Sequence, residues 1–152
     1  MEKAIIFDWG RTLYYSVDRK EVPDAEKVLR YCQDHGYRLA TVSFVSTGAN
    51  FTLEEKTIVI EKSTLRKYFE VALVTDQNKD DALDVIVAHF GIPRESIYIV
   101  DDRIIRGIRY GNKCGHPTIW FQNGKFANEL PNETTGQPTY TIKSLDELLK
   151  LL

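Results

Sequence analysis

The chain has 152 residues, of which 43% are hydrophobic and 28% are charged, and its formal net charge is −2. This size and composition predict a single globular domain over residues 1–152. The near-neutral charge argues against nucleic acid as a partner, and no apolar run approaches the ~18 residues that cross a bilayer. A signal peptide is not expected either, because the first apolar run is interrupted at Asp8. We therefore expect a cytoplasmic protein without membrane contacts.

The first expected element is a strand that runs through Ile5, Ile6 and Phe7 into Asp8. These residues are apolar without interruption, and the polar, glycine-containing stretch after them marks a turn. Such a run indicates a strand buried on both faces. Its carboxyl end, where open α/β sheets bind ligands, carries Asp8. That carboxylate can serve as a nucleophile or a metal ligand, although a residue that merely ends a strand gives the same pattern.

Further short apolar strands alternate with amphipathic helical segments along the chain. The expected strands are Tyr37–Ser43, Val71–Thr75, Ile97–Val100, Thr118–Phe121 and, at an edge, Tyr140–Ile142. The expected helices follow Pro23, Thr52, Ser63 or Thr64, Asn78, Arg103 and Ser144, and capping-box pairs mark two of these starts, Thr52 with Glu55 and Ser144 with Glu147. The alternation predicts an α/β fold with one doubly wound, Rossmann-like parallel sheet and helices on both faces.

Chemically useful side chains stand at four strand ends or strand–helix junctions. They are Asp8, Ser43, Lys79 and the pair Asp101-Asp102. Because the carboxyl ends of parallel strands meet at one edge of a sheet, these side chains could share one crevice. Three carboxylates in one place repel each other unless a cation joins them, and oxygen ligands favour Mg²⁺. A hydroxyl and a lysine beside that ion are what a phosphoryl group needs.

With these motifs the sequence resembles the haloacid dehalogenase (HAD) superfamily of phosphohydrolases from end to end. FDWGRTL is similar to the first family motif, which implies that Asp8 attacks phosphorus and forms an aspartyl-phosphate. LATVS resembles the second motif, which implies that Ser43 holds a phosphate oxygen, and Lys79 matches the lysine of the third. IYIVDD resembles the metal-binding fourth motif, in which Asp102 corresponds to the principal ligand and Asp101 to a position often filled by glycine.

Two positions depart from the family pattern. The family's phosphatases carry a second aspartate two residues after the nucleophile, as general acid and base, and here that position is Gly10. Its backbone carbonyl can still bind Mg²⁺, so we expect metal binding to persist while turnover loses a contribution of typically ~10²–10⁴-fold. The second departure is Gly107, where a further acidic residue of the metal site is common.

Three functions are compatible with this pattern. The first is a slow or specialised Mg²⁺-dependent phosphatase for good leaving groups, such as acyl or aryl phosphates. Its substrate would be a phosphorylated small molecule or a phosphate that protrudes from a larger one. The second is a catalytically impaired phosphate-binding or regulatory module that kept the fold and the metal. The third is a dehalogenase-like hydrolase, which requires a helical cap with an apolar pocket.

No cap domain is expected in this chain. The segment between Leu13 and Pro23 is only a short flap, and the segment between Ser43 and Lys79 holds only one helical region and a strand. This lack of room argues against the dehalogenase. A capless member of the family leaves its site open or closes it by homo-oligomerisation. A response-regulator receiver uses a similar residue set, but there the acid pair precedes the phosphorylated aspartate, which is the reverse of the order here.

Side chains beside the motifs have two interpretations each. Arg11, which stands where the family has glycine, could bind substrate phosphate or lie on the surface of the flap. Trp9, Tyr14 and Tyr15 could stack on an aromatic substrate or pack into the core.

A second basic feature follows the acid pair. Its members, about one helical turn apart, are Arg103, Arg106, Arg109 and Lys113. They could form a docking strip for a phosphate-bearing or nucleic-acid partner, but the near-neutral chain favours a solvated helix face.

Overall fold

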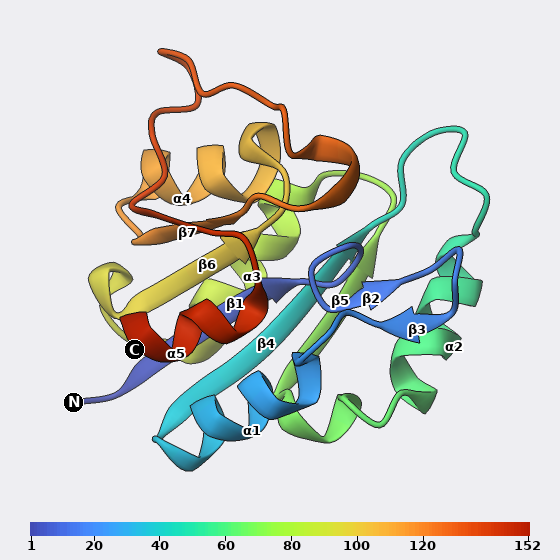
Figure 1. Ribbon diagram of the computed structural model, residues 1–152, viewed down its shortest axis with the longest axis horizontal. Helices are drawn as coiled ribbons and strands as arrows, with labels where there is room; N and C mark the ends of the chain where they lie inside the picture. The colour runs from blue at the N-terminus through green and yellow to red at the C-terminus, as the bar shows by residue number, and fades with distance from the viewer.

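The computed structural model describes residues 1–152 and contains one six-stranded sheet in the order β5-β4-β1-β6-β7-β8 (Figure 1). All neighbouring strands in this sheet are parallel. The strands are β1 (Lys3–Asp8), β4 (Tyr37–Phe44), β5 (Val71–Thr75), β6 (Ile97–Asp101), β7 (Thr118–Phe121) and β8 (Tyr140–Ile142). The predicted α/β class with a doubly wound parallel sheet is therefore confirmed.

Helices cover both faces of the sheet, as Figure 1 shows. The α-helices are α1 (Ala25–Asp34), α2 (Leu53–Lys62), α3 (Lys79–Phe90), α4 (Arg109–Cys114) and α5 (Leu148–Leu151). Helices α1 and α5 pack on one face, where Leu29 and Leu148 join a core with Phe7. Helix α3 packs on the other face, where Leu83 joins Ile6. Because both faces are covered, β1 reads as a continuous apolar run.

Short helical turns complete the chain. They are η1 (Arg66–Tyr68), η2 (Arg94–Ser96), η4 (Gly124–Phe126) and η5 (Leu145–Glu147), which are 3₁₀-helices, and the π-helix η3 (Ile104–Ile108). The helix expected after Arg103 is thus a π-helix that leads into α4. Within it Ile104 and Ile108 are buried, and Ile105 is 44% exposed.

The capping boxes found in the sequence are both formed. The Thr52 hydroxyl accepts a hydrogen bond from the backbone N–H of Glu55, and the Glu55 carboxylate accepts one from the backbone N–H of Thr52. Ser144 and Glu147 form the equivalent pair. That second box opens the 3₁₀ turn η5, and α5 follows it. None of the helices combines the length and apolar composition that a membrane span requires.

The two segments in which a cap could be inserted hold small elements only. Between β1 and α1 the chain forms the two-stranded hairpin of β2 (Tyr14–Tyr15) and β3 (Lys20–Glu21), which we call the flap. Between β4 and α3 it forms a loop, α2, η1 and β5. Neither of these two segments holds a cap domain, in agreement with the sequence analysis.

The strand order determines where a ligand site is expected. From β1 the chain first moves outward through β4 to β5, and then returns to the other side of β1 for β6, β7 and β8. The direction of winding therefore reverses between β1 and β6. In open α/β sheets, ligands bind at the carboxyl ends of the strands beside such a reversal. Asp8 and Asp101 are the last residues of these two strands.

Candidate functional site

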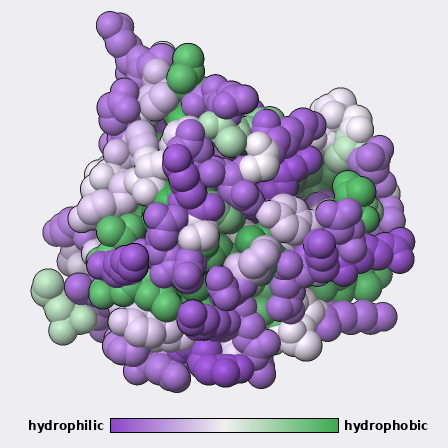
Figure 2. Space-filling view, in the orientation of Figure 1, coloured by the Kyte–Doolittle hydropathy of each residue, from purple (hydrophilic) through white to green (hydrophobic).

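A cleft of about 470 Å³ opens at this edge of the sheet. Its floor includes Asp8, Ser43 and Asp102, and its walls come from the flap, the loop between β4 and α2, and the segment around η4. The upper edge of the molecule is hollowed between these segments, and hydrophilic side chains dominate its rim (Figure 2). A polar opening of this kind suits a charged substrate.

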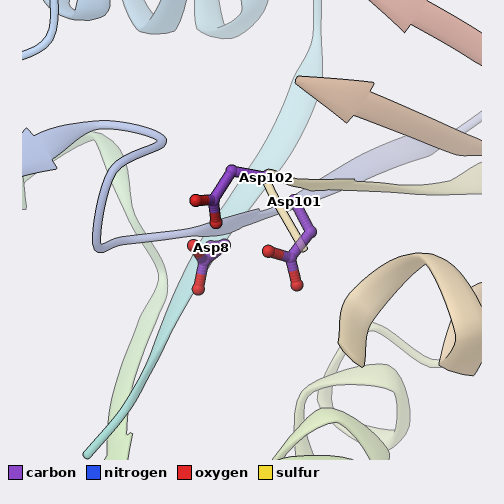
Figure 3. A group of neighbouring side chains, drawn as sticks. All are labelled: Asp8, Asp101 and Asp102. Atoms are coloured by element: carbon purple, nitrogen blue, oxygen red, sulfur yellow. The ribbon is translucent and has the colours of Figure 1, made fainter. Parts of the chain in front are cut away.

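The three predicted acids and the predicted lysine lie together: Asp8, Asp102 and Lys79 line the cleft, and Asp101 is buried beside them. One ligand atom from each of Asp8, Asp101 and Asp102 lies within 4.8 Å of the others, and Figure 3 shows the carboxylates of Asp8 and Asp102 facing each other. The Nζ atom of Lys79 lies 2.8 Å from Oδ1 of Asp8 and 2.9 Å from Oδ2 of Asp101. Lys79 is the first residue of α3, whose start is capped by the side chain of Asn78. Strand ends and a helix start thus bring the four side chains together.

Asp101 is fully engaged by hydrogen-bond donors from the protein. Its Oδ1 accepts from the backbone N–H of Arg103, and its Oδ2 accepts from the backbone N–H of Gly107 and from Lys79. Burial alone would raise the pKa of Asp101, but Lys79 and the two backbone donors outweigh burial and the pKa is lowered. Asp101 is therefore an anion that holds the Lys79 ammonium in place. These contacts favour a role in positioning Lys79 over direct metal binding.

Asp102 has the opposite environment. Its backbone is fixed because Trp120 donates a hydrogen bond from Nε1 to the Asp102 carbonyl, over 3.0 Å. Its Oδ2 atom, however, is buried without any hydrogen-bond partner. Burial first, and then the charges of Asp8 and Asp101, raise the pKa of Asp102 to about 10. A buried carboxylate without a partner beside two others is the environment that a divalent cation would complete.

Two further residues of the first motif, Thr12 and Gly10, lie near Asp8, and of these only Gly10 lines the cleft. The Thr12 hydroxyl donates to Oδ2 of Asp8 over 3.2 Å, so both oxygens of that carboxylate are oriented by protein groups. Burial, followed by the charge of Asp101, raises the pKa of Asp8. The sequence analysis missed Thr12, although its place four residues after Asp8 in a tight turn could have indicated it. Gly10 also faces the cleft, and a Cβ atom built on it would meet nothing within 4 Å.

Ser43 and Arg11 both line the cleft beside Asp8. Ser43 is buried near the end of β4, in the strand next to β1. Arg11 has a positive φ of 60°, and its guanidinium lies 5.2 Å from the ring centre of Phe126. The expectation that Arg11 could reach bound phosphate is compatible with this place, and its role remains a prediction.

The aromatic residues in and just after the first motif, Trp9, Tyr14 and Tyr15, divide between the core and the cleft. Trp9 is fully buried and stacks on Tyr14 at a centroid distance of 5.4 Å, so Trp9 cannot stack on a substrate. Tyr15 lines the cleft, and its hydroxyl accepts a hydrogen bond from Asn123.

The four basic residues after the acid pair do not share one face. Arg103 and Arg106 line the cleft, Arg109 is paired with Asp80 over 2.8 Å, and Lys113 is exposed. The four residues therefore form neither a docking strip nor a single solvated helix face. The α-helical spacing assumed for the strip fails because η3 is a π-helix.

The C-terminal half of the chain, residues 77–148, matches the HAD-hydrolase-like family model. Over 138 residues the chain is 28% identical to glyceraldehyde 3-phosphate phosphatase from Pyrococcus furiosus, which covers 88% of this chain and 55% of that protein. Over 99 residues it is 30% identical to the pyrimidine 5'-nucleotidase PynA from Streptococcus pneumoniae, which covers 61% of this chain and 40% of that protein. The chain thus spans about half the length of these relatives, or less.

Solved structures share the fold over a wider range. D,D-heptose 1,7-bisphosphate phosphatase from B. bronchiseptica, complexed with magnesium and phosphate, superposes with a TM-score of 0.77 at 13% identity and covers 99% of both chains. The magnesium-bound HAD-hydrolase YfnB from Bacillus subtilis superposes with a TM-score of 0.69 at 19% identity and covers 88% of this chain and 56% of that one. Both proteins hold magnesium, and the Asp8, Asp101 and Asp102 cluster of this chain is of a kind that could bind a metal ion.

Proposed function

We propose that this chain, whose residues 77–148 match the HAD-hydrolase-like family model and whose fold superposes on HAD structures, is a Mg²⁺-dependent phosphohydrolase that uses Asp8 as its nucleophile. The observation that carries the proposal is the pairing of Asp8 with Lys79 beside the unpartnered carboxylate of Asp102. The named activities of the curated relatives, a sugar-phosphate phosphatase and a nucleotidase, are of the same class.

The protein groups prepare Asp8 for attack. Lys79 and Thr12 each donate a hydrogen bond to one of its oxygens, which fixes the orientation of the carboxylate toward the cleft. An oxygen of Asp8 forms a bond to phosphorus while the bond from phosphorus to the leaving oxygen breaks, and the leaving oxygen takes the bonding electron pair. Water then attacks the aspartyl-phosphate and releases phosphate and the free carboxylate.

Lys79 and Ser43 would hold the transferred phosphoryl group. Lys79 is charged, because the two carboxylates beside it outweigh burial and raise its pKa. Its ammonium reaches Asp8 and therefore also the oxygens of a phosphoryl group that Asp8 attacks. Ser43 opens into the same cleft and can donate its hydroxyl hydrogen to one of those oxygens. Asp101 keeps Lys79 in place throughout.

The metal would be held by Asp8, Asp102 and the backbone carbonyl of Gly10, with Asp101 at its border. When bound, Mg²⁺ supplies positive charge to the phosphoryl oxygens and neutralises the clustered carboxylates. The buried Oδ2 atom of Asp102, which lacks a hydrogen-bond partner, fits that group.

Proton supply to the leaving oxygen sets the substrate range. Gly10 has no side chain, so the chain lacks an acid two residues after its nucleophile. Besides Asp8 and Asp102, the one carboxylate that lines the cleft is that of Asp18, an exposed residue at the tip of the flap. We propose that the enzyme acts on acyl or aryl phosphates, whose leaving groups depart without a proton.

Hydrolysis of acetyl phosphate, p-nitrophenyl phosphate and glycerol 3-phosphate in Mg²⁺ tests the proposal. We expect slow turnover of acetyl phosphate and p-nitrophenyl phosphate, and glycerol 3-phosphate should be hydrolysed at least tenfold more slowly still. Asp8→Asn should hydrolyse none of them. Asp18→Asn should change the first two rates less than twofold. Wild-type protein that binds phosphate and Mg²⁺ without turnover would instead support the regulatory module. A glycerol 3-phosphate rate that falls at least tenfold in Asp18→Asn would show that the flap supplies a proton.

A further inference from the structure

The cleft carries more positive charge than one phosphoryl group requires. Six cationic side chains line it against three carboxylates. The cations are Arg11, Lys56, Lys79, Arg103, Arg106 and Lys125. Two of them are neutralised within the protein, because Lys79 is paired with Asp8 and Asp101 and Arg103 is paired with Glu129 at 3.0 Å. The other four have no carboxylate within ion-pair distance.

Aromatic rings hold these unpaired cations in place. The Arg106 guanidinium lies 4.6 Å from the ring centre of Phe44, and the Lys56 ammonium lies 5.1 Å from that of Phe51. Arg11 lies over Phe126 at 5.2 Å. A ring face attracts a cation but leaves its hydrogen-bond donors unused. The side chains are thus positioned while their charge and donors stay available to a ligand.

Two of these cations are partly withdrawn from water. Burial lowers the pKa of the Lys56 ammonium, and its Nζ atom has a single protein partner, the Ser16 hydroxyl at 2.6 Å. Burial, followed by the charge of Arg103, lowers the pKa of the Arg106 guanidinium, for which the structure gives no hydrogen bond. A partly buried cation that has no ion-pair partner lowers the stability of the protein, and a bound anion would offset this loss.

Arg11 adds an independent observation, because its backbone is in the left-handed region with a φ of 60°. That conformation is unfavourable for a residue with a Cβ atom, and glycine adopts it without this penalty. Such strain clusters at functional sites. An arginine at this position therefore lowers local stability, and the residue lines the cleft.

We propose that Arg11, Lys56 and Arg106, which we call the cationic rim, bind a second anionic group of the substrate. The preferred substrate is then a small molecule with two anionic groups: a phosphoryl group that reaches Asp8, and a phosphate or carboxylate on the cationic rim. This inference rests on the proposed function for the place of the first group. The residues of the rim come from three different elements, which are the loop after β1, α2 and η3, and all three line the same cleft.

Binding of phosphonates, which the enzyme cannot hydrolyse, tests the inference without requiring turnover. Isothermal titration calorimetry in Mg²⁺ would compare propylphosphonate with 1,3-propanediphosphonate and with 4-phosphonobutyrate, and diphosphonates with linkers of two to six carbons would find the best spacing. We expect the best ligand with two anionic groups to bind at least tenfold more tightly than propylphosphonate, which has one. The diphosphonate and the phosphonocarboxylate distinguish phosphate from carboxylate as the second group.

Variants of the cationic rim provide the decisive comparison. In Arg106→Gln and in Lys56→Gln, the ligand with two anionic groups should bind less than threefold more tightly than propylphosphonate. The affinity for propylphosphonate itself should change less than twofold. Lys113→Gln, a matched change at an exposed residue outside the cleft, should leave both affinities unchanged. Equal affinity for all ligands would overturn the inference, as would an equal loss for both ligand types in the rim variants. Phosphonate binding without any phosphatase turnover would refute the proposed function alone.

Discussion

The carboxylate of Asp101 occupies the space into which a side chain at position 107 would project. A Cβ atom built on Gly107 would lie 2.4 Å from Oδ2 of Asp101 and 2.8 Å from its Cβ atom. The backbone N–H of Gly107 donates to that same Oδ2 atom over 2.8 Å. An acid at 101 and a side chain at 107 therefore exclude each other. We infer that the acid at 101, where the family often has glycine, and the glycine at 107, where it often has an acid, compensate each other.

This relationship predicts strong coupling between substitutions at the two positions. Gly107→Asp alone should lower the free energy of unfolding by at least the ~1–3 kcal/mol typical of overpacking. Asp101→Gly alone leaves the buried Lys79 with one anionic partner and should also destabilise the fold. The double variant should recover most of both losses, because an acid at 107 then fills the vacated space. Urea unfolding of all four proteins measures the coupling.

Gly107→Ala in both backgrounds is the control for that cycle, because it adds volume without charge. It should be destabilising beside Asp101 and nearly neutral beside Gly at 101. Strictly additive effects, within ~0.5 kcal/mol, would contradict the exchange.

Much of the fold and of the site floor follows from local rules. The buried run before Asp8, the capping box at Thr52 and the strands that end within one residue of Ser43 and Val100 each follow from periodicity or turn chemistry. The spacing between Asp101 and Gly107 gave no such signal. Gly107 lies in the π-helix η3, a rare element whose residue spacing differs from that of the α-helix expected there.

The walls of the cleft could not be predicted in the same way. Lys56 and Arg106 are separated by 50 positions, and each is an ordinary amphipathic-helix residue when considered alone. Only tertiary packing sets them over Phe51 and Phe44 at one opening. The flap was expected only as a short polar segment, because two-residue strands carry no usable periodicity.

Gly10→Asp should raise phosphatase activity toward poor leaving groups. A side chain at this position has room, since a Cβ atom there meets nothing within 4 Å. The new carboxyl group would face the cleft and could protonate the leaving oxygen, a contribution of typically ~10²–10⁴-fold. We expect at least a tenfold gain with glycerol 3-phosphate and a smaller gain with acetyl phosphate. Gly10→Asn is the matched control, and an equal gain in that variant would exclude acid catalysis as the cause.

Removal of Mg²⁺ should make stability depend on pH through Asp102. Its pKa in the folded chain is about 10, above the value of ~4 for an unfolded aspartate. The protonated form is thus favoured by folding, and its contribution is complete below pH ~4 and lost as the pH rises toward 10. In EDTA, the melting temperature should fall between pH 6 and pH 9. Asp102→Asn should flatten that decline and melt at a higher temperature than wild type at pH 8.5.

Added Mg²⁺ should have the complementary effect. Because the ion competes with the proton for the carboxylates, 10 mM MgCl₂ should stabilise the wild type more at pH 8.5 than at pH 6. The same addition should leave the melting temperature of Asp102→Asn unchanged. Thermal melts with MgCl₂ and with equal ionic strength of NaCl separate binding from screening. A magnesium response that survives in Asp102→Asn would exclude Asp102 as the principal ligand.

Arg11 should show a trade between stability and binding. With a φ of 60°, the backbone at position 11 favours glycine. The free energy of unfolding of Arg11→Gly, measured by denaturant titration, should therefore exceed that of Arg11→Ala by about 1 kcal/mol. Both variants lose the same guanidinium and its contact with Phe126, so the difference between them isolates the backbone. Both variants should also lose, to the same extent, the tighter binding of a phosphonate with two anionic groups, because that binding depends on the guanidinium charge of Arg11. If Arg11→Ala were as stable as Arg11→Gly, the backbone strain would be absent in solution. The arginine would then carry no cost that a binding role has to explain.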